Sequence, residues 1–272
     1  MWKRLASALS AIAITVFFLR VGYAEAALPA TASLPQSAAL QARWKLDEAS
    51  GTRNDSVGSN HLTDNNTVAT GVGPFTDVCA DFERDNTESL SRADNAALSL
   101  TSSFSIFGWI NTESNTVTYT LASKFATGGN QRSYLFQLDI NNFSGLVLYL
   151  SSNGSATDTP SNAFSPTNGV WYHVGVVYDA PAGSARFYVD GSPLAAATTG
   201  VTTSVFDGSS TFYLGSWQTG SADLYDGLMQ DMMVWNVALS PAEAASAYAS
   251  YTSRGSPKTI IIVFYSDNNT YA

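Results

Sequence analysis

Three carboxylates, Glu83, Asp85 and Glu88, follow one another with the spacing E-x-D-x-x-E. Alternate side chains of a β-strand point to the same face, so a strand here would bring two of these groups together. Retaining cleavage of a glycosidic bond requires two carboxyl groups about 5–5.5 Å apart. The intervening Arg84 and Asn86 are polar and do not suit a packed strand. We therefore expect a polar loop, and keep a glycoside hydrolase or polysaccharide lyase using Glu83 and Glu88 as an alternative.

The two histidines and the single cysteine offer little else for catalysis. His173 alternates with apolar residues along an expected strand, and no serine or cysteine nucleophile motif accompanies it, so we predict a core position. Cys79 is expected to be a small buried hydrophobic residue. One cysteine also excludes both a disulfide framework and a zinc–thiolate site. The chain is therefore predicted not to be an enzyme.

Two aromatic residues are candidates for ligand binding. Trp217 lies in an expected loop at residues 215–220, and Tyr225 follows shortly after it. The apolar face of an aromatic ring matches the C–H face of a pyranose, so such side chains can stack on sugars. An alternative is that Trp217 covers the end of the fold. We predict Trp217 and Tyr225 as ligand-binding residues and keep the covering role open.

The loop at residues 54–58, with the sequence Asn-Asp-Ser-Val-Gly, suggests a cation site. Calcium takes about six to eight oxygen ligands, which loops supply as carboxylates and backbone carbonyls. Asp55 would provide a carboxylate. The alternative is that the Asp55 side chain caps its own turn by accepting hydrogen bonds from nearby backbone N–H groups.

The composition limits the kind of protein that carries these residues. The chain has 272 residues, of which 45% are hydrophobic and 13% are charged. That is enough apolar material for a substantial core, and it excludes a disordered chain. The formal net charge of −9 makes the surface repel phosphate backbones, which disfavours nucleic acid as a partner.

The N-terminus has the features of a secretory signal peptide. Lys3 and Arg4 precede an apolar stretch, and residues 24–26, Ala-Glu-Ala, match the pattern that signal peptidase reads. The apolar stretch is shorter than the roughly 20 residues needed to span a bilayer. We predict a signal peptide at residues 1–26, a flexible leader at residues 27–41, and a secreted or cell-envelope protein with no membrane span after signal removal.

The C-terminal residues 252–272 are expected to form a tail outside the main domain. This tail contains one strongly β-prone segment, Thr-Ile-Ile-Ile-Val-Phe-Tyr at residues 259–265, which is too short to span a membrane. Such a segment would be an aggregation hazard if exposed. It either pairs with the edge of a sheet or begins a further region, and both alternatives stay open.

Residues 42–251 contain short apolar runs that mostly end in Gly, Asn, Asp or Ser. Residues 104–110 are apolar on both faces, which is typical of a central strand. Residues 133–140 and 146–150 are separated by turn residues and predict a hairpin. Further strands are expected at residues 171–178, 186–189, 212–215 and 228–235.

One helix is expected, near the end of this domain. Ser240 and Glu243 form a capping box, and Pro241 occupies the first helical position. Many strands followed by one late helix, without βαβ spacing, predict an all-β fold. The predicted architecture is an antiparallel β-sandwich with one short C-terminal helix.

The order of several short motifs is similar to that of a known family. They are RWKLDEASG at residues 43–51, NDS at 54–56, GSNHL at 58–62, the strand at 104–110, WYHV at 171–174, FYVDG at 187–191, LGS at 214–216, YDGL at 225–228, WN at 235–236 and LSPAE at 239–243. Together they resemble the laminin-G-like members of the concanavalin A-like lectin/glucanase superfamily. The resemblance covers about residues 42–250.

This resemblance implies a jelly roll of two antiparallel sheets, one of them concave. It implies recognition of glycans, proteins or cell surfaces, often with one bound calcium ion. It also implies that the terminal strands pair, which would place Asp231 where it could supply a second carboxylate beside Asp55. The E-x-D-x-x-E spacing is similar to that of laminarinase- and lichenase-type glycosidases, which share this superfold.

We therefore expect a secreted, non-catalytic module that recognises glycans or cell-surface or matrix components. Trp217 and Tyr225 would contact the ligand, and calcium would be held by Asp55 and Asp231. The alternatives are the hydrolase or lyase described above and a structural or adhesin module that binds protein. A fold does not determine a ligand, so neither the ligand nor the oligomeric state is predicted.

Overall fold

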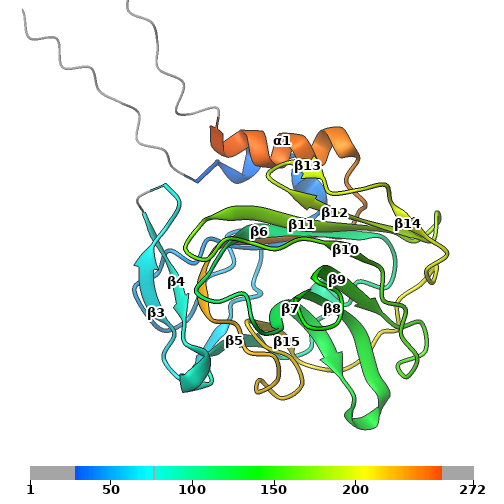
Figure 1. Ribbon diagram of the computed structural model, residues 1–272, viewed down its shortest axis with the longest axis horizontal. Helices are drawn as coiled ribbons and strands as arrows, with labels where there is room; N and C mark the ends of the chain where they lie inside the picture. The colour runs from blue at the N-terminus through cyan, green and yellow to red at the C-terminus, as the bar shows by residue number, and fades with distance from the viewer. Residues whose placement is uncertain (1–27, 76, 253–272) are drawn as a thin grey trace, which may run out of the picture. The chain divides into compact units, whose positions relative to one another are not determined.

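The computed structural model of the protein describes residues 28–75 and 77–252. This part of the chain contains two antiparallel β-sheets that pack face to face, and one α-helix, α1 (Pro241–Thr252), on the outside of one sheet (Figure 1). The predicted antiparallel sandwich with one short C-terminal helix is confirmed. The predicted signal peptide and the β-prone segment of the tail lie outside the described residues.

One sheet has nine strands, and its main path runs in the order β13-β12-β11-β6-β16-β4-β3. In addition, β1 pairs with β16 and β14 pairs with β12. The strands are β1 (Leu40–Trp44), β3 (Ala69–Val72), β4 (Val78–Phe82), β6 (Phe104–Thr112), β11 (Tyr172–Asp179), β12 (Ser184–Val189), β13 (Ser192–Pro193), β14 (Thr198–Thr199) and β16 (Gly227–Trp235). The pairing of β1 with β16 joins the first and last strands, as the resemblance implied.

The other sheet has seven strands in the order β10-β9-β8-β7-β15-β5-β2. The strands are β2 (Thr63–Asn65), β5 (Ser89–Arg92), β7 (Tyr119–Ala126), β8 (Gln131–Asp139), β9 (Gly145–Leu150), β10 (Ser161–Ala163) and β15 (Phe212–Leu214). Strands β8 and β9 form the predicted hairpin, with Phe136 opposite Leu148.

The main core lies between the two sheets. Strand β6 contributes Phe104 and Ile106, and strand β8 contributes Tyr134 and Phe136 from the facing sheet. Burial of one such side chain contributes about 1.5–3 kcal/mol, so this layer dominates the stability of the sandwich. All nine residues of β6 are buried, which confirms the prediction of a strand that is apolar on both faces.

A second apolar cluster covers the outer face of the nine-stranded sheet. Phe107, Trp109 and Trp235 point outward from their strands and pack beneath α1, which contributes Tyr251. The helix begins at the predicted capping box. The Ser240 backbone N–H donates to Glu243 Oε2 at 2.8 Å, and the Glu243 N–H donates to Ser240 Oγ at 3.3 Å.

Residues 28–41 differ from the expected flexible leader. Leu34 and Leu40 are buried in the outer cluster, and Trp235 Nε1 donates to the Pro35 carbonyl at 3.0 Å. Two 3₁₀ turns, η1 (Thr31–Ser33) and η2 (Ser37–Ala39), lead directly into β1. The Ala- and Ser-rich composition suggested flexibility, but the two leucines provide enough apolar surface to hold the segment against the sheet.

His173 and Cys79 occupy the predicted buried positions. The His173 ring lies against Phe107, Trp109 and Tyr251, with centroids 5.3–5.6 Å apart, and neither ring nitrogen has a hydrogen-bond partner among the described residues. Burial lowers the pKa of His173 to about 3. Burial raises the pKa of Cys79 to about 12, so its thiol stays protonated.

Candidate functional site

Trp217 lies on the outer side of the seven-stranded sheet, in the loop that joins β15 to β16. The loop turns back on itself through a bridge between Trp217 and Ala222. It is held to β7 because the Gln218 N–H donates to the Phe125 carbonyl at 3.2 Å and the Thr120 N–H donates to the Asp223 carbonyl at 2.8 Å. The loop therefore presents Trp217 from a fixed position above the sheet.

Four aromatic rings form a continuous row on this outer face, which we call the aromatic row. Trp217 meets Phe125 with centroids 5.5 Å apart, Phe125 meets Tyr149 at 6.2 Å, and Tyr149 meets Phe143 at 6.0 Å. Each contact is edge-to-face, with interplanar angles of 66–88°. Phe125 is buried, whereas the other three rings are partly exposed. The row offers apolar ring surface to a ligand.

Two carboxylates and an amide hydrogen-bond to the aromatic row or beside it; Asp223 is exposed, whereas Asp139 and Gln137 are buried. Asp223 Oδ2 accepts hydrogen bonds from Trp217 Nε1 at 2.8 Å and from Gln137 Nε2 at 2.9 Å. Asp139 Oδ2 accepts from the Tyr149 hydroxyl at 3.4 Å. Burial alone would raise the pKa of Asp139, but hydrogen bonds led by those from Asn142 lower it overall. Asp139 is therefore an ionised acceptor at neutral pH.

Tyr225 does not belong to this surface, and its prediction as a ligand-binding residue is corrected. Its side chain is fully buried between Phe82 and Tyr119, with centroids 5.9 and 5.5 Å away. Its hydroxyl donates to the Leu228 carbonyl at 3.1 Å. The chain re-enters the core at Tyr225 before β16 begins, so proximity in sequence did not place Tyr225 beside Trp217.

Asp231 is not available as a metal ligand. It is fully buried, and Arg43 Nε and Nη2 donate to its two oxygens at 2.7 and 2.8 Å. The Tyr251 hydroxyl donates to Oδ2 at 2.7 Å. A β-bulge in β16, with a positive φ of 51° at Asp231, turns this side chain toward Arg43. The predicted role of Asp231 in calcium binding is therefore corrected to an ion-pair role.

Asp55 serves its own loop. Its carboxylate accepts the backbone N–H groups of Arg43, Val57 and Asn60 at 3.1, 2.9 and 3.0 Å. This is the capping role kept as the alternative, and it uses both carboxylate oxygens. The oxygens of Asp55 accept backbone N–H groups and those of Asp231 accept from Arg43. The two aspartates therefore do not fit the predicted calcium site. No pattern in the sequence indicated that Arg43 would be buried.

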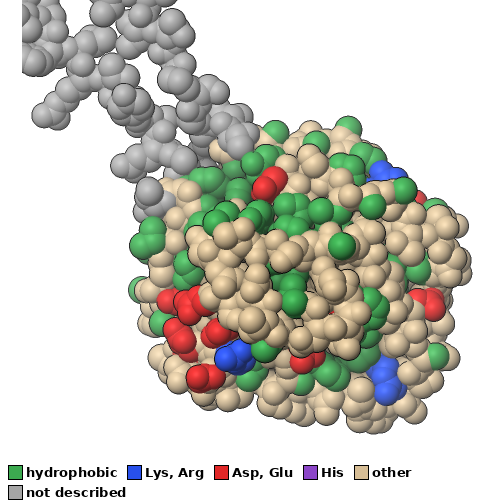
Figure 2. Space-filling model, in the orientation of Figure 1, with side chains coloured by type: hydrophobic (Ala, Val, Ile, Leu, Met, Phe, Trp, Pro, Cys, Tyr) green, Lys and Arg blue, Asp and Glu red, His purple; other side chains and the backbone are tan. Residues whose placement is uncertain are grey.

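A different set of carboxylates could hold a cation. One oxygen each from Asp81, Glu83 and Glu113 lies within 4.8 Å of the others. Burial raises the pKa of Asp81, and the nearby charge of Asp226 adds to this effect. The pKa of Glu113 is also raised, first by burial and then by the charges of Glu83, Asp81 and Asp226. Figure 2 has the orientation of Figure 1, and in it acidic side chains gather over the region where Figure 1 labels β3, β4 and β5. Such oxygen donors suit a hard cation.

The sequence did not reveal Glu113 as a neighbour of Asp81 and Glu83, because Glu113 follows β6 whereas the other two lie at the end of β4. Phe82 at the end of β4 and Thr112 at the end of β6 both pair with Gly227 of β16. The residues that follow, Glu83 and Glu113, therefore leave the sheet at the same edge. Only the strand order, which is not visible in a motif, brings them together.

Glu83 and Glu88 do not lie on a strand together. A 3₁₀ turn, η3 (Arg84–Asn86), separates them, as the polar sequence predicted. Glu88 is buried, and its Oε2 accepts the Glu83 backbone N–H at 2.8 Å while Oε1 accepts Asn86 Nδ2 at 3.2 Å. Burial raises the pKa of Glu88. Its carboxylate closes this loop, so the strand alternation that the hydrolase alternative requires is absent here.

A family model described as the concanavalin A-like lectin/glucanases superfamily matches residues 84–245. The match covers more than half of the chain. The chain belongs to this superfamily. The predicted laminin-G-like jelly roll is thereby confirmed, and the superfamily includes both binding modules and glycosidases. No helix in the ranges 28–75 and 77–252 is long and apolar enough to cross a membrane.

Solved structures show the same superfamily fold at low sequence identity. Domain 4 of an extracellular arabinanase from Geobacillus stearothermophilus, in complex with arabinotriose, is 20% identical with a TM-score of 0.57. That match covers 77% of this chain and 98% of the domain. The binding domain of Paraclostridial Mosquitocidal Protein 1 is 13% identical with a TM-score of 0.64, over 79% of this chain and 52% of that one.

Botulinum neurotoxin type C, whose cell entry depends on interaction with two ganglioside molecules, is 15% identical with a TM-score of 0.57. The match covers 80% of this chain and 51% of the toxin chain. The chain thus spans about half the length of each of these two toxin chains. At these identities the likeness shows the fold alone.

Proposed function

We propose that this protein is a secreted, non-catalytic module of the superfamily that binds glycan chains along the aromatic row. The observation that carries the proposal is the row itself, in which Trp217, Tyr149 and Phe143 are partly exposed on one face of the sandwich. Sugar rings have apolar C–H faces that stack on such side chains. Several aromatic side chains in line suit a chain of sugar units better than a single one.

Polar groups beside the row support the same ligand class. Asp223 is exposed and is an acceptor for sugar hydroxyls beside Trp217. Gln137 and Asp139 are buried, and they hold Asp223 and Tyr149 in place by hydrogen bonds. A few well-placed polar groups around an apolar surface are typical of sites that combine affinity with orientation. The arabinanase domain bound to arabinotriose and the neurotoxin that interacts with gangliosides support a carbohydrate ligand for this fold.

The proposal is tested by affinity electrophoresis of the protein through gels that contain one polysaccharide each. The panel should include arabinan, xylan, a mixed-linkage β-glucan and an acidic pectin, each run with calcium and with EGTA. The expected result is retardation by at least one neutral polysaccharide. Unchanged mobility in every gel would overturn the glycan proposal and favour a module that binds protein.

A further inference from the structure

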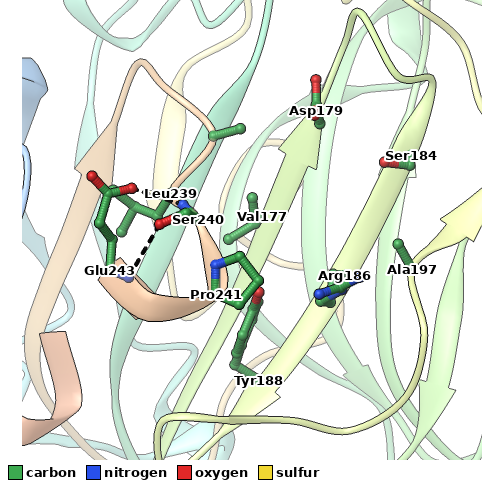
Figure 3. Close-up of a pocket in the computed structure, with 11 residues that line it drawn as sticks. Val177, Asp179, Ser184, Arg186, Tyr188, Ala197, Leu239, Ser240, Pro241 and Glu243 are labelled. Atoms are coloured by element: carbon green, nitrogen blue, oxygen red, sulfur yellow. Dashed lines mark hydrogen bonds between the residues drawn. The ribbon is translucent and has the colours of Figure 1, made fainter. Parts of the chain in front are cut away.

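The outer face of the nine-stranded sheet contains a groove that is separate from the aromatic row. Its volume is about 390 Å³, which lies within the approximate range of 300–1,000 Å³ found for small-molecule sites. The floor is formed by the ends of β11 and β12, and the opposite wall by the segment that leads into α1 (Figure 3). Helix α1 starts beside this groove and covers the other part of the sheet, around His173.

The floor of the groove is set by strand register. Val177 pairs with Arg186 and Asp179 pairs with Ser184, and all four point away from the main core. The residues that alternate with them, such as Phe187, are buried between the sheets. Because paired strands move little, these four side chains have fixed positions relative to one another.

The wall of the groove is also held in place. The Leu239 N–H donates to Ser105 Oγ at 3.0 Å, and Ser240 and Glu243 cap the helix through their mutual hydrogen bonds. Gln36 Nε2 donates to Glu243 Oε1 at 2.6 Å. Both oxygens of Glu243 are thus engaged, and Pro241 presents aliphatic surface toward the floor (Figure 3). The groove is preformed, which reduces the entropy cost of binding.

Two charged side chains on the floor have unused hydrogen-bonding capacity. Arg186 forms no ion pair with any carboxylate in the described part of the chain, and it lies on the same face of β12 as Tyr188. Asp179 accepts the Ala182 N–H through Oδ1 at 3.3 Å. The two residues are diagonal neighbours on adjacent strands, and no ion pair joins them in the structure.

We propose that this groove binds a neutral saccharide unit, as a second glycan site on the sheet opposite the aromatic row. A sugar hydroxyl both donates and accepts, so adjacent hydroxyls can donate to Asp179 and accept from Arg186. Pro241 is exposed, and its aliphatic ring surface matches the C–H face of the sugar. The groove is lined by two acidic residues, Asp179 and Glu243, and one basic residue, Arg186. Its net negative charge disfavours phosphates and acidic sugars.

A second site on the opposite sheet would change what the module does with a polysaccharide. One molecule could contact two chains, or two stretches of one chain, and the linked contacts would raise the apparent affinity. The inference does not depend on the proposed function, because the groove shares no residue with the aromatic row.

The test is chemical-shift mapping of the ¹⁵N-labelled protein titrated with maltose, cellobiose, lactose, arabinobiose and digalacturonic acid. For at least one neutral disaccharide, we expect shifts at the amides of Val177, Arg186 and Ser240. Arg186→Gln and Asp179→Asn should each weaken that binding at least tenfold. Arg84→Gln, the matched change at an exposed loop arginine, should leave it unchanged.

Each remaining outcome is decisive. Shifts confined to residues around Trp217 would overturn the groove and leave the proposed function standing. The absence of groove shifts with every disaccharide, unchanged affinity in Arg186→Gln, or stronger groove binding of digalacturonic acid than of the neutral disaccharides would also overturn it. Both floor residues are on the surface, and unfolding curves of their variants check that the fold is intact.

Discussion

The Arg43 guanidinium lies against the Asp231 carboxylate in a two-pronged ion pair, with Nε–Oδ1 and Nη2–Oδ2 distances of 2.7 and 2.8 Å. Both side chains are fully buried. Arg43 belongs to β1 and Asp231 to β16, so the pair joins the first and last strands of the domain. Burial opposes the charge on Arg43, but Asp231 raises the pKa of Arg43 overall. The residue expected to bind calcium instead joins the two ends of the fold.

Asp231→Asn should lower the free energy of unfolding by about 3–5 kcal/mol, because it leaves the buried Arg43 charge without its partner. The measurement is chemical denaturation at neutral pH. Asp85→Asn provides the matched control, since the Arg84–Asp85 pair is exposed and its closest contact is 3.6 Å. Exposed pairs contribute about 0–1 kcal/mol. Equal losses in the two variants would contradict the structural role given to Asp231.

Asp55→Ala should lower the free energy of unfolding by about 1–3 kcal/mol, because three backbone N–H groups lose their acceptor. Since these hydrogen bonds use both carboxylate oxygens, the loss should be the same in excess calcium and in EGTA. Thermal unfolding in the two buffers checks this. A loss seen only when calcium is present would restore Asp55 as a metal ligand.

His173 should make the protein less stable as pH falls. Its pKa is about 3 in the folded protein, where burial disfavours the charged form, and about 6.5 when unfolded. Between these values the unfolded chain binds one more proton, so stability decreases on acidification by about 1.4 kcal/mol per pH unit. The rings of Tyr248 and Tyr251 pack against it, and Asp190 accepts its backbone N–H at 2.9 Å.

Denaturation curves at several pH values between 6.5 and 4 measure this slope. In His173→Phe the contribution of this group disappears, while the carboxylates that titrate in the same range remain. The difference between the parent and the variant should therefore shrink or reverse as pH falls. Parallel curves for the two proteins would show that His173 can be protonated in the folded state.

The protein should release no reducing sugar from any polysaccharide that it binds. Glu88 is bonded to the Glu83 N–H and to Asn86, and a 3₁₀ turn separates the two glutamates. Glu88→Gln should therefore leave glycan retention unchanged. Reducing ends are measured after prolonged incubation. Release of sugar that is lost in Glu83→Gln would support the hydrolase alternative instead.

The fold could be predicted because its local signals agree with one another. The run at residues 104–110, the β8–β9 hairpin and the capping box at Ser240 each appear in the structure. The site was harder to predict because it depends on pairing between distant strands. Glu113 meets Asp81 and Glu83 only through the register of β4 and β6 with β16, and Arg43 reaches Asp231 across 188 residues.

The other incorrect predictions, for Tyr225 and for the segment before β1, arose because burial could not be inferred from the sequence. Trp217 and Tyr225 both follow β15 in a loop sequence, yet one is partly exposed and the other completely buried. The difference arises because Tyr225 closes the core between Phe82 and Tyr119. Likewise, Leu34 and Leu40 fix a segment whose composition indicated flexibility. Composition and motif order do not show which side of a sheet a loop residue will face.

The most direct test of the glycan-binding account compares Trp217→Ala with Trp171→Ala by affinity electrophoresis in the polysaccharide gel that retards the parent protein. Trp171 is also partly exposed, but it packs with the outer cluster on the other sheet. We predict at least tenfold weaker retention for Trp217→Ala, because ring stacking is lost, and unchanged retention for Trp171→Ala. Full retention of Trp217→Ala would contradict binding along the aromatic row.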